Sequence, residues 1–196
     1  MGLVSRELKG EEKELGLTVT PYARTGVVFG VNAEVSESET TFEDIVAIYR
    51  GTKSSWKDGR EIIVLTREPG DSSIELLAGT VPGFSEAYAE SWKARRWTAL
   101  FTDQAMEKAL RKVPNAIGFA DMGYARAEAS GIKALSINGV SPTLESLSSG
   151  KYPFVKTLSF VYLGDGLPEE ARLFIEYARS EEAANIMRDA GYLPAE

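Results

Sequence analysis

The sequence of 196 residues contains neither cysteine nor histidine. Disulfide bonds, thiolate chemistry, serine–histidine triads and histidine-bound zinc or iron are therefore excluded. Among the residues that remain, no nucleophile or acid–base constellation is visible, which makes an enzyme the least favoured class of function. These absences indicate a binding protein, for which we expect neither a metal nor an organic cofactor.

A positive net charge and long apolar runs are also missing. The formal net charge is −7, which argues against a nucleic-acid partner or an anionic membrane surface. No run is long enough to span a membrane, and residues 1–20 lack the apolar core of a signal peptide. We therefore expect a cytoplasmic protein, or a periplasmic or extracellular one if an upstream signal peptide is missing from this sequence.

Strand-like and helix-like segments alternate along the chain. Apolar runs predict strands over residues 26–31, 62–65, 98–101, 116–120, 134–137 and 158–162, and residues 1–6 resemble the end of a strand. Caps and apolar periodicity predict helices over residues 42–49, 80–96, 103–113 and 121–129, with others beginning near Ser72, Pro168 and Ser180. This alternation favours an α/β fold with a mostly parallel sheet, whose ligands bind at the carboxyl ends of strands.

Several helix starts carry capping patterns. Thr40 with Glu43, and Ser72 with Glu75, have the spacing of a capping box, while Ser141 and Pro142 fit the N-cap and first position of a small helix. Near the end of the chain, two apolar stripes are expected to face the core: Ala171, Phe174, Ile175 and Ala178, then Ala183, Ile186, Met187 and Ala190.

Residues 62–73 run from a buried strand through a polar turn into a helix start. Arg67 stands just past the carboxyl end of the strand, and Pro69 and Gly70 form the turn. Free amides at the helix start together with the guanidinium of Arg67 would suit an oxyanion or a carboxylate. The alternative is a well-capped helix beside a solvated arginine, and this stretch alone does not decide between them.

A second cluster combines cations with aromatic side chains. Lys93, Arg95 and Arg96 lie close to Trp92 and Trp97. This pattern could be read as a nucleic-acid patch, but three cations in an acidic protein are more often a solvated helix end. We favour the second interpretation.

A series of motifs extends over nearly the whole chain. They lie at residues 2–8 with Glu11 and Glu12, 42–51 with Trp56, 63–70, 116–119, 133–140 with Pro142 and Thr143, 149–153, 180–183 and 190–194. In this order and spacing, they specifically resemble the phosphate-type substrate-binding proteins of bacterial ABC transporters, within the periplasmic-binding-protein-like group of the type II fold.

The resemblance implies two lobes joined by a two-strand hinge, with the ligand clamped between them. Residues 1–32 and 125–196 would form one lobe, incomplete at its N-terminus, and residues 33–124 the other. The protein would bind phosphate, sulfate or a related small anion and deliver it to the permease of an ABC transporter. A rival hypothesis is a sensor or interaction domain that keeps the fold but binds a different ligand or none.

In the family, one ligand loop lies at the position of Ser5 and Arg6 and another at residues 67–73. Arg67 would supply charge, the amides of Gly70, Ser72 and Ser73 would supply direction, and Ser5, Arg6 and Thr102 would complete the clamp. Two alternatives stay open. Ser72 could be occupied as a helix cap, and Arg6 could pair on the surface with Glu11 or Glu12.

Two departures from the family bear on the ligand. Asp71 stands where the family has a serine, and at about 4 Å and an effective dielectric near 20 it would repel an anion by about 4 kcal/mol. The repulsion is avoided if a proton is shared or if Asp71 turns away as a helix N-cap.

The second departure is at the beginning, because family members have several dozen more residues before Ser5. Either the sequence lacks an upstream part or it is a reduced homologue, and an open sheet edge would then favour a homodimer.

Overall fold

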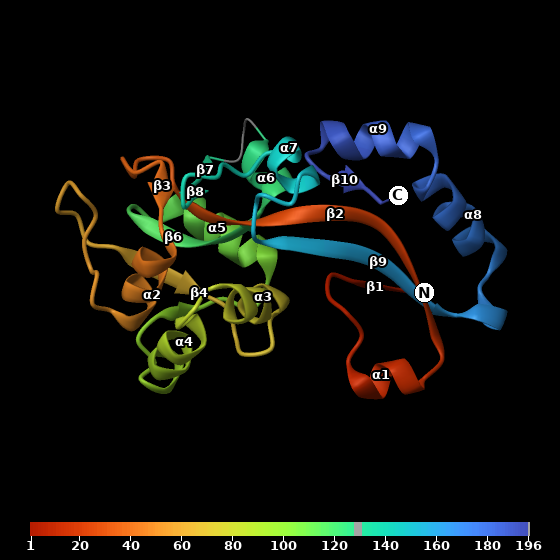
Figure 1. Ribbon diagram of the computed structural model, residues 1–196, viewed down its shortest axis with the longest axis horizontal. Coiled ribbons are helices and arrows are strands. Elements are labelled where there is room, and N and C mark those ends of the chain that lie inside the picture. The colour runs from red at the N-terminus through yellow and green to blue at the C-terminus, as the bar shows by residue number, and fades with distance from the viewer. Residues whose placement is uncertain (128–130, 196) are drawn as a thin grey trace.

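The long strand β2, Leu17–Asn32, runs through the middle of the molecule and pairs with partners at both of its ends (Figure 1). The computed structural model describes residues 1–127 and 131–195. The first half of β2 pairs antiparallel with β9, Val155–Leu163, and its second half with β6, Ala116–Asp121, and β7, Ile132–Ala134. The register of β2 against β9 shifts between Pro21 and Ala23.

The larger part of the molecule is built around parallel strands. β4, Ile63–Thr66, lies between β6 and β5, Thr98–Ala99, and is parallel to both. Four helices accompany these strands: α2, Phe42–Arg50; α3, Ser72–Thr80; α4, Phe84–Lys93; and α5, Asp103–Lys112. Buried aliphatic and aromatic side chains from all of them form one large core, which includes Tyr49, Phe84, Leu110, Ile117 and Phe119.

The other end of the β2–β9 pair carries the N-terminal and C-terminal elements (Figure 1). Strand β1, Gly2–Val4, pairs antiparallel with β9, and α1, Gly10–Glu14, follows it. After β9 come a 3-10 turn at Gly164–Gly166, then α8, Glu169–Ala178, and α9, Glu181–Asp189. Strand β10, Leu193–Pro194, returns to pair with β2. A small second core of Phe160, Ile175 and Ala178 forms here.

Short elements complete the chain. β3, Glu39–Thr40, is parallel to β8, Ser136–Ile137. Along the chain, helix α6, Met122–Arg126, follows β6, and helix α7, Leu144–Ser148, precedes β9. In the described ranges 1–127 and 131–195, no helix combines the length and apolar character that crossing a membrane requires.

The predicted α/β alternation is confirmed, but the sheet is mixed rather than mostly parallel, because β2 pairs antiparallel with each of its partners. The strand predicted at residues 26–31 is the second half of β2, and the one at 134–137 is divided between β7 and β8. Of the helix predicted over 121–129, positions 128–129 lie outside the described residues.

Three predicted helix starts were wrong by one or two positions. Thr41 rather than Thr40 caps α2, Asp71 rather than Ser72 caps α3, and Thr143 rather than Ser141 caps α7. In each case the side-chain oxygen of the observed cap accepts a bond from an amide in the first turn. The predictions failed because several candidate caps stand next to one another, and spacing alone does not choose between them.

The two apolar stripes near the C-terminus are only partly buried. Ile175, Ala178 and Ala183 are in the core, whereas the side chains of Phe174 and Ile186 remain 52% and 55% exposed. Leu3 of β1 pairs with Phe160 of the neighbouring strand β9, and Leu3 is 67% exposed. Helix α8 therefore covers Phe160 but leaves apolar side chains uncovered around it.

Candidate functional site

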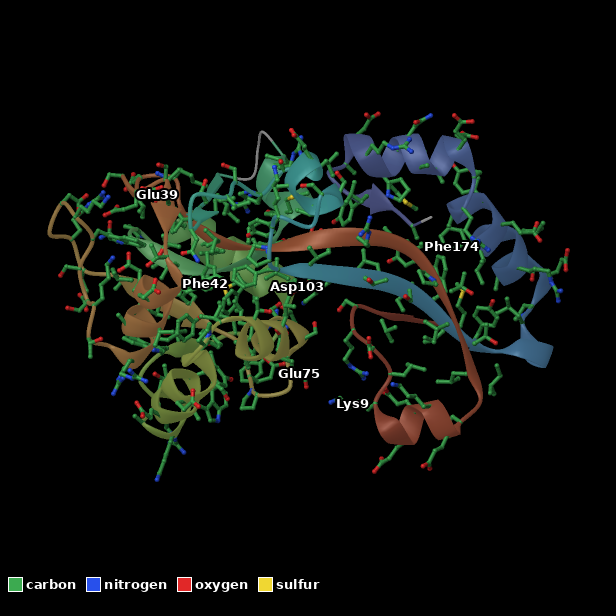
Figure 2. The ribbon with its side chains drawn as sticks, viewed as in Figure 1. Lys9, Glu39, Phe42, Glu75, Asp103 and Phe174 are labelled. Atoms are coloured by element: carbon green, nitrogen blue, oxygen red, sulfur yellow. The ribbon has the colours of Figure 1, made fainter. Side chains whose placement is uncertain are left out.

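A polar cavity of about 130 Å³ lies where the long β2–β9 pair meets the carboxyl end of β4 and the start of α3. Its volume suits a small ion better than a larger organic ligand, for which pockets of about 300–1,000 Å³ are usual. The lining comprises Ser5, Thr25, Val27, Arg67, Ser73, Asp103, Glu107, Phe119, Ala120, Asp121, Lys156 and Leu158. Figure 2 labels Asp103, which lies near the middle of the molecule at the start of α5.

The Arg67 guanidinium is held by carboxylates on both sides. Its Nη1 lies 2.6 Å from Oδ1 of Asp103, and its Nη2 lies 2.9 Å from Oδ2 of Asp71. The Nε atom is buried and has no hydrogen-bond partner in the described part of the chain. The hydroxyl of Tyr88 donates to the Arg67 carbonyl oxygen at 2.8 Å and so fixes the backbone. Arg67 is oriented toward the cavity, and it still has N–H groups to offer a ligand.

Asp71 is turned away from the cavity by two bonds. Its Oδ1 accepts the Ser73 amide at 2.8 Å, which makes Asp71 the N-cap of α3, while Oδ2 accepts from Arg67. This is the arrangement in which the carboxylate avoids an incoming anion. The same bond occupies the Ser73 amide, so that amide is not available to a ligand.

Lys156 on β9 is a cation that the sequence analysis did not single out. Its Nζ donates to the hydroxyls of Ser72 and Ser73 at 2.7 and 2.9 Å. Burial lowers the pKa of Lys156, while the nearby carboxylates of Asp71 and Asp103 act in the opposite direction. The ammonium thus brings a second positive charge to the cavity wall opposite β4.

The remaining wall is acidic. Asp121 accepts the Thr25 hydroxyl at 2.8 Å through Oδ2 and the Gly123 amide at 2.8 Å through Oδ1. Burial, followed by repulsion from Asp103 and Asp121, raises the pKa of Glu107. Two cations, Arg67 and Lys156, and three carboxylates, those of Asp103, Glu107 and Asp121, therefore line one small cavity. The cations can donate hydrogen bonds to acceptor atoms of a ligand, and the carboxylates can accept hydrogen bonds from its donor groups.

The structure brings some of the predicted site residues together and separates others. Ser5, Arg67 and Ser73 line the cavity, and Gly70, Asp71 and Ser72 border a shallow depression beside it. Thr102 caps α5, its hydroxyl oxygen accepting from the Ala105 amide, and it does not line the cavity.

Arg6 lies outside the cavity as well and forms two hydrogen bonds with Glu12, at 2.7 and 2.8 Å. This is the surface pair that the sequence had left open as an alternative. The bond from Arg6 lowers the pKa of Glu12 to about 2.

Two contacts join the N-terminal segment to α3. The hydroxyls of Ser5 and Ser72 lie 3.2 Å apart, and the Lys9 ammonium lies 3.7 Å from a carboxylate oxygen of Glu75. Figure 2 shows Lys9 and Glu75 facing one another across the space between α1 and α3. Both parts of the molecule therefore contribute side chains to the site.

The polar residues that sequence reasoning missed are Thr25, Asp103, Glu107, Asp121 and Lys156. Each lies on a strand or helix rather than in a recognisable loop motif. The sequence carries no usable signal for Lys156, because β9 is only partly buried and a lysine in such a strand is ordinary. Among the described residues, no group of three or more acidic side chains is arranged to hold a metal ion.

Comparisons with known proteins identify the family of this chain. A family model described as PBP superfamily domain matches residues 1–182. The phosphate-binding protein PstS of Borreliella burgdorferi is 24% identical over 202 residues, covering 98% of this chain and 71% of the relative. The phosphate-binding protein PstS of Bacillus subtilis is 26% identical over 176 residues, covering 88% of this chain and 56% of that relative. The chain thus spans little more than half of one relative and about seven tenths of the other.

Solved structures show the same fold. A proposed phosphate ABC transporter substrate-binding protein from Clostridium perfringens, solved with bound phosphate, superposes with a TM-score of 0.86 at 24% identity, over 100% of this chain and 79% of that one. An ABC-type phosphate transport receptor from Vibrio cholerae superposes with a TM-score of 0.66 at 22% identity, over 97% and 78%. The predicted periplasmic-binding-protein-like α/β fold is confirmed.

Proposed function

Because the chain belongs to the PBP superfamily, we propose that it binds a small tetrahedral oxyanion, phosphate first, and delivers it to the permease of an ABC transporter. The observation that carries the proposal is the convergence of Arg67 and Lys156 on one cavity of about 130 Å³ lined by Ser5 and Ser73. The relatives named for phosphate binding support this choice of ligand. In this role the protein moves a solute and catalyses no reaction.

The acidic wall favours an anion that carries a proton. Asp121 and Glu107 can accept a hydrogen bond from a protonated oxygen, whereas a fully ionised sulfate presents only acceptors to them. We therefore propose that phosphate binds more tightly than sulfate. The exposed Asp103, whose side chain is 82% accessible, can move aside and free an N–H of Arg67 for the ligand.

The clamp would work between two lobes. The proposed division is residues 1–32 with 125–196 against residues 33–124, with β2 and β9 as the connecting strands. The packing supports moving the second boundary from residue 125 to near Val155. Leu147, Tyr152 and Phe154 lie in the same large core as Phe119, which belongs to the 33–124 lobe. The register shift between Pro21 and Ala23 is a natural place for β2 to bend.

Of the predicted site residues, Ser5, Arg67 and Ser73 keep a proposed role as direct ligand contacts. The hydroxyl of Ser72 and the amides of Gly70 and Ser72 border the neighbouring depression, where they would meet the ligand after a small closure. Arg6 and Thr102 are proposed to act only by holding their own segments, through Glu12 and the first turn of α5.

Transport implies a place outside the cytoplasmic membrane, so we propose a periplasmic or extracellular location. The rival, a sensor or interaction domain, is less favoured because the named relatives are phosphate-binding proteins.

We also propose a homodimer. It is supported by the open edge of β1 and by three exposed apolar side chains, those of Leu3, Phe174 and Ile186. Analytical ultracentrifugation over a range of concentrations tests it, and a monomer throughout would contradict it.

The proposal is tested by titration calorimetry with phosphate and sulfate. Phosphate should bind, sulfate should bind at least about tenfold more weakly, and Arg67→Gln should lower the phosphate affinity by roughly a hundredfold. Arg179→Gln removes the same charge from an exposed helix end and should change nothing. Folded protein that binds neither anion at millimolar concentration would overturn the proposal.

A further inference from the structure

A second cavity, with aromatic side chains in its wall, is not part of the oxyanion site. It has a volume of about 370 Å³ and is lined by Thr66, Tyr88, Ser91, Trp92, Arg95, Trp97 and Ala99. Thr66 and Ala99 are the last residues of β4 and β5, which are parallel neighbours. The cavity therefore opens at the carboxyl ends of two parallel strands, where α/β proteins bind ligands. Its volume lies in the range of pockets for small organic molecules.

Flat aromatic surfaces form most of its wall. The rings of Tyr88 and Trp92 are stacked with centroids 6.1 Å apart. Trp97 is fixed by a hydrogen bond from its indole nitrogen to the Tyr49 carbonyl at 2.9 Å, and the Ser91 hydroxyl donates to the same carbonyl. These side chains are held by the protein itself, so the cavity is largely preformed for a planar ring.

The lining of the cavity includes an uncommitted positive charge. Lys93 ends α4, and Arg95 and Arg96 follow it. Arg96 is occupied by the Arg50 carbonyl and by the ring of Trp97. Arg95 lines the cavity, and within the described ranges its guanidinium has no hydrogen bond or ion pair. None of the described lining residues is acidic, so the cavity is complementary to a carboxylate.

Thr66 contributes a buried side chain to the wall. Its hydroxyl and that of Tyr49 are both inaccessible to solvent, and they interact with each other without the geometry of an ordinary hydrogen bond. Thr66 as a whole is only 3% exposed. Because solvent does not reach the Thr66 hydroxyl, Arg95 is the charged group that the lining offers to a ligand.

We propose that this cavity is a second binding site, for a planar aromatic carboxylate. The ring lies against Trp92 and Tyr88, and the carboxylate pairs with Arg95. The site is distinct from the oxyanion cavity, although the two adjoin at β4, where Thr66 precedes Arg67 and Tyr88 donates to the Arg67 carbonyl. The cationic aromatic cluster thus has a use other than as a nucleic-acid patch.

Three matched probes test each part of the proposal: benzoate, cyclohexanecarboxylate and benzamide. They are titrated into the protein saturated with phosphate, so that the oxyanion site is blocked, and the indole N–H signals are followed by NMR. Benzoate should shift the signals of Trp92 and Trp97 and leave Trp56, which lies outside the cavity, unchanged. Cyclohexanecarboxylate, which lacks a flat ring, should bind several-fold more weakly, and the amide at least about tenfold more weakly.

Two variants assign the contacts. Arg95→Gln should remove the preference for the acid over the amide, whereas Lys93→Gln, which removes a neighbouring charge outside the cavity, should not. Neither Arg95→Gln nor Lys93→Gln should alter phosphate affinity. Equal binding of acid and amide, no shift with any probe, or a preference that survives Arg95→Gln would overturn the proposal.

Discussion

The Lys156 ammonium on β9 bridges the hydroxyls of Ser72 and Ser73 at the start of α3, at 2.7 and 2.9 Å. The lysine lies on β9 and the serines begin α3, so this bridge links the long β2–β9 pair to the start of that helix. A desolvated cation held by two neutral hydroxyls lacks full compensation, and an anion entering the cavity would supply it.

Replacing Lys156 should therefore affect binding more than folding. We expect Lys156→Gln to lower phosphate affinity roughly ten- to a hundredfold, because one charge-assisted hydrogen bond is lost. Calorimetry measures the change, and Lys151→Gln, at an exposed position, is the matched control. Unchanged affinity would place Lys156 outside the site.

The same variant should change the pH dependence of stability. Burial lowers the pKa of Lys156, so just below its usual value of 10.5 the unfolded chain holds more protons than the folded one. The free energy of unfolding should then rise with pH in that window, and this contribution should vanish in Lys156→Gln. Urea unfolding of the ligand-free protein at a series of alkaline pH values compares the two slopes.

Asp71 both caps α3 and holds Arg67, and two substitutions separate these roles. Asp71→Ser keeps a capping oxygen but removes the charge, so it should raise affinity for sulfate relative to phosphate by freeing Nη2 of Arg67. Asp71→Ala removes the cap as well and should lower the free energy of unfolding by about 1–3 kcal/mol. If Asp71→Ser weakens the binding of both anions, the orienting bond matters more than the charge.

The Arg6–Glu12 pair should respond to acid. The pKa of Glu12 is lowered to about 2 from a usual value near 4.5, so the contribution of the pair is complete above 4.5 and is lost as the pH falls toward 2. Carbon-13 NMR of the Glu12 carboxyl group should show titration near 2. In Arg6→Gln the midpoint should move back toward the usual value, and a midpoint unaffected by this change would contradict the pairing.

Gly123 permits a close contact behind the acidic wall. A Cβ atom at this position would lie 2.5 Å from a ring carbon of Tyr192 and 2.6 Å from the Ala190 carbonyl oxygen. Gly123→Ala should lower the free energy of unfolding by about 1–3 kcal/mol through overpacking. Gly79→Ala, where a Cβ atom meets nothing within 4 Å, should be neutral or stabilising by up to about 1 kcal/mol. Equal effects of the two changes in urea unfolding would contradict the packing argument.

Local pattern predicted the segment around Arg67 well, since a strand, an arginine and a helix start follow one another within residues 62–73. It could not find Lys156 or Asp121, because their meeting with Ser73 depends on pairings of β2 with β6 and β9. The choice between Asp71 and Ser72 as cap was likewise decided by the tertiary contact of Asp71 with Arg67. Sequence periodicity also marked Phe174 and Ile186 as core, although periodicity shows only that a face is apolar, not that anything covers it.

The pairing of β2 has a consequence for how the chain is made. Residues Leu17 to Gly26 find their partners in Leu163 to Val155, which leave the ribosome long after them. The strand partners of the second half of β2, β6 and β7, are synthesised much earlier, by residue 134. During synthesis the central core can therefore form while the first half of β2 is still unpaired, and a nascent chain stalled near residue 150 should expose that half to proteases or chaperones.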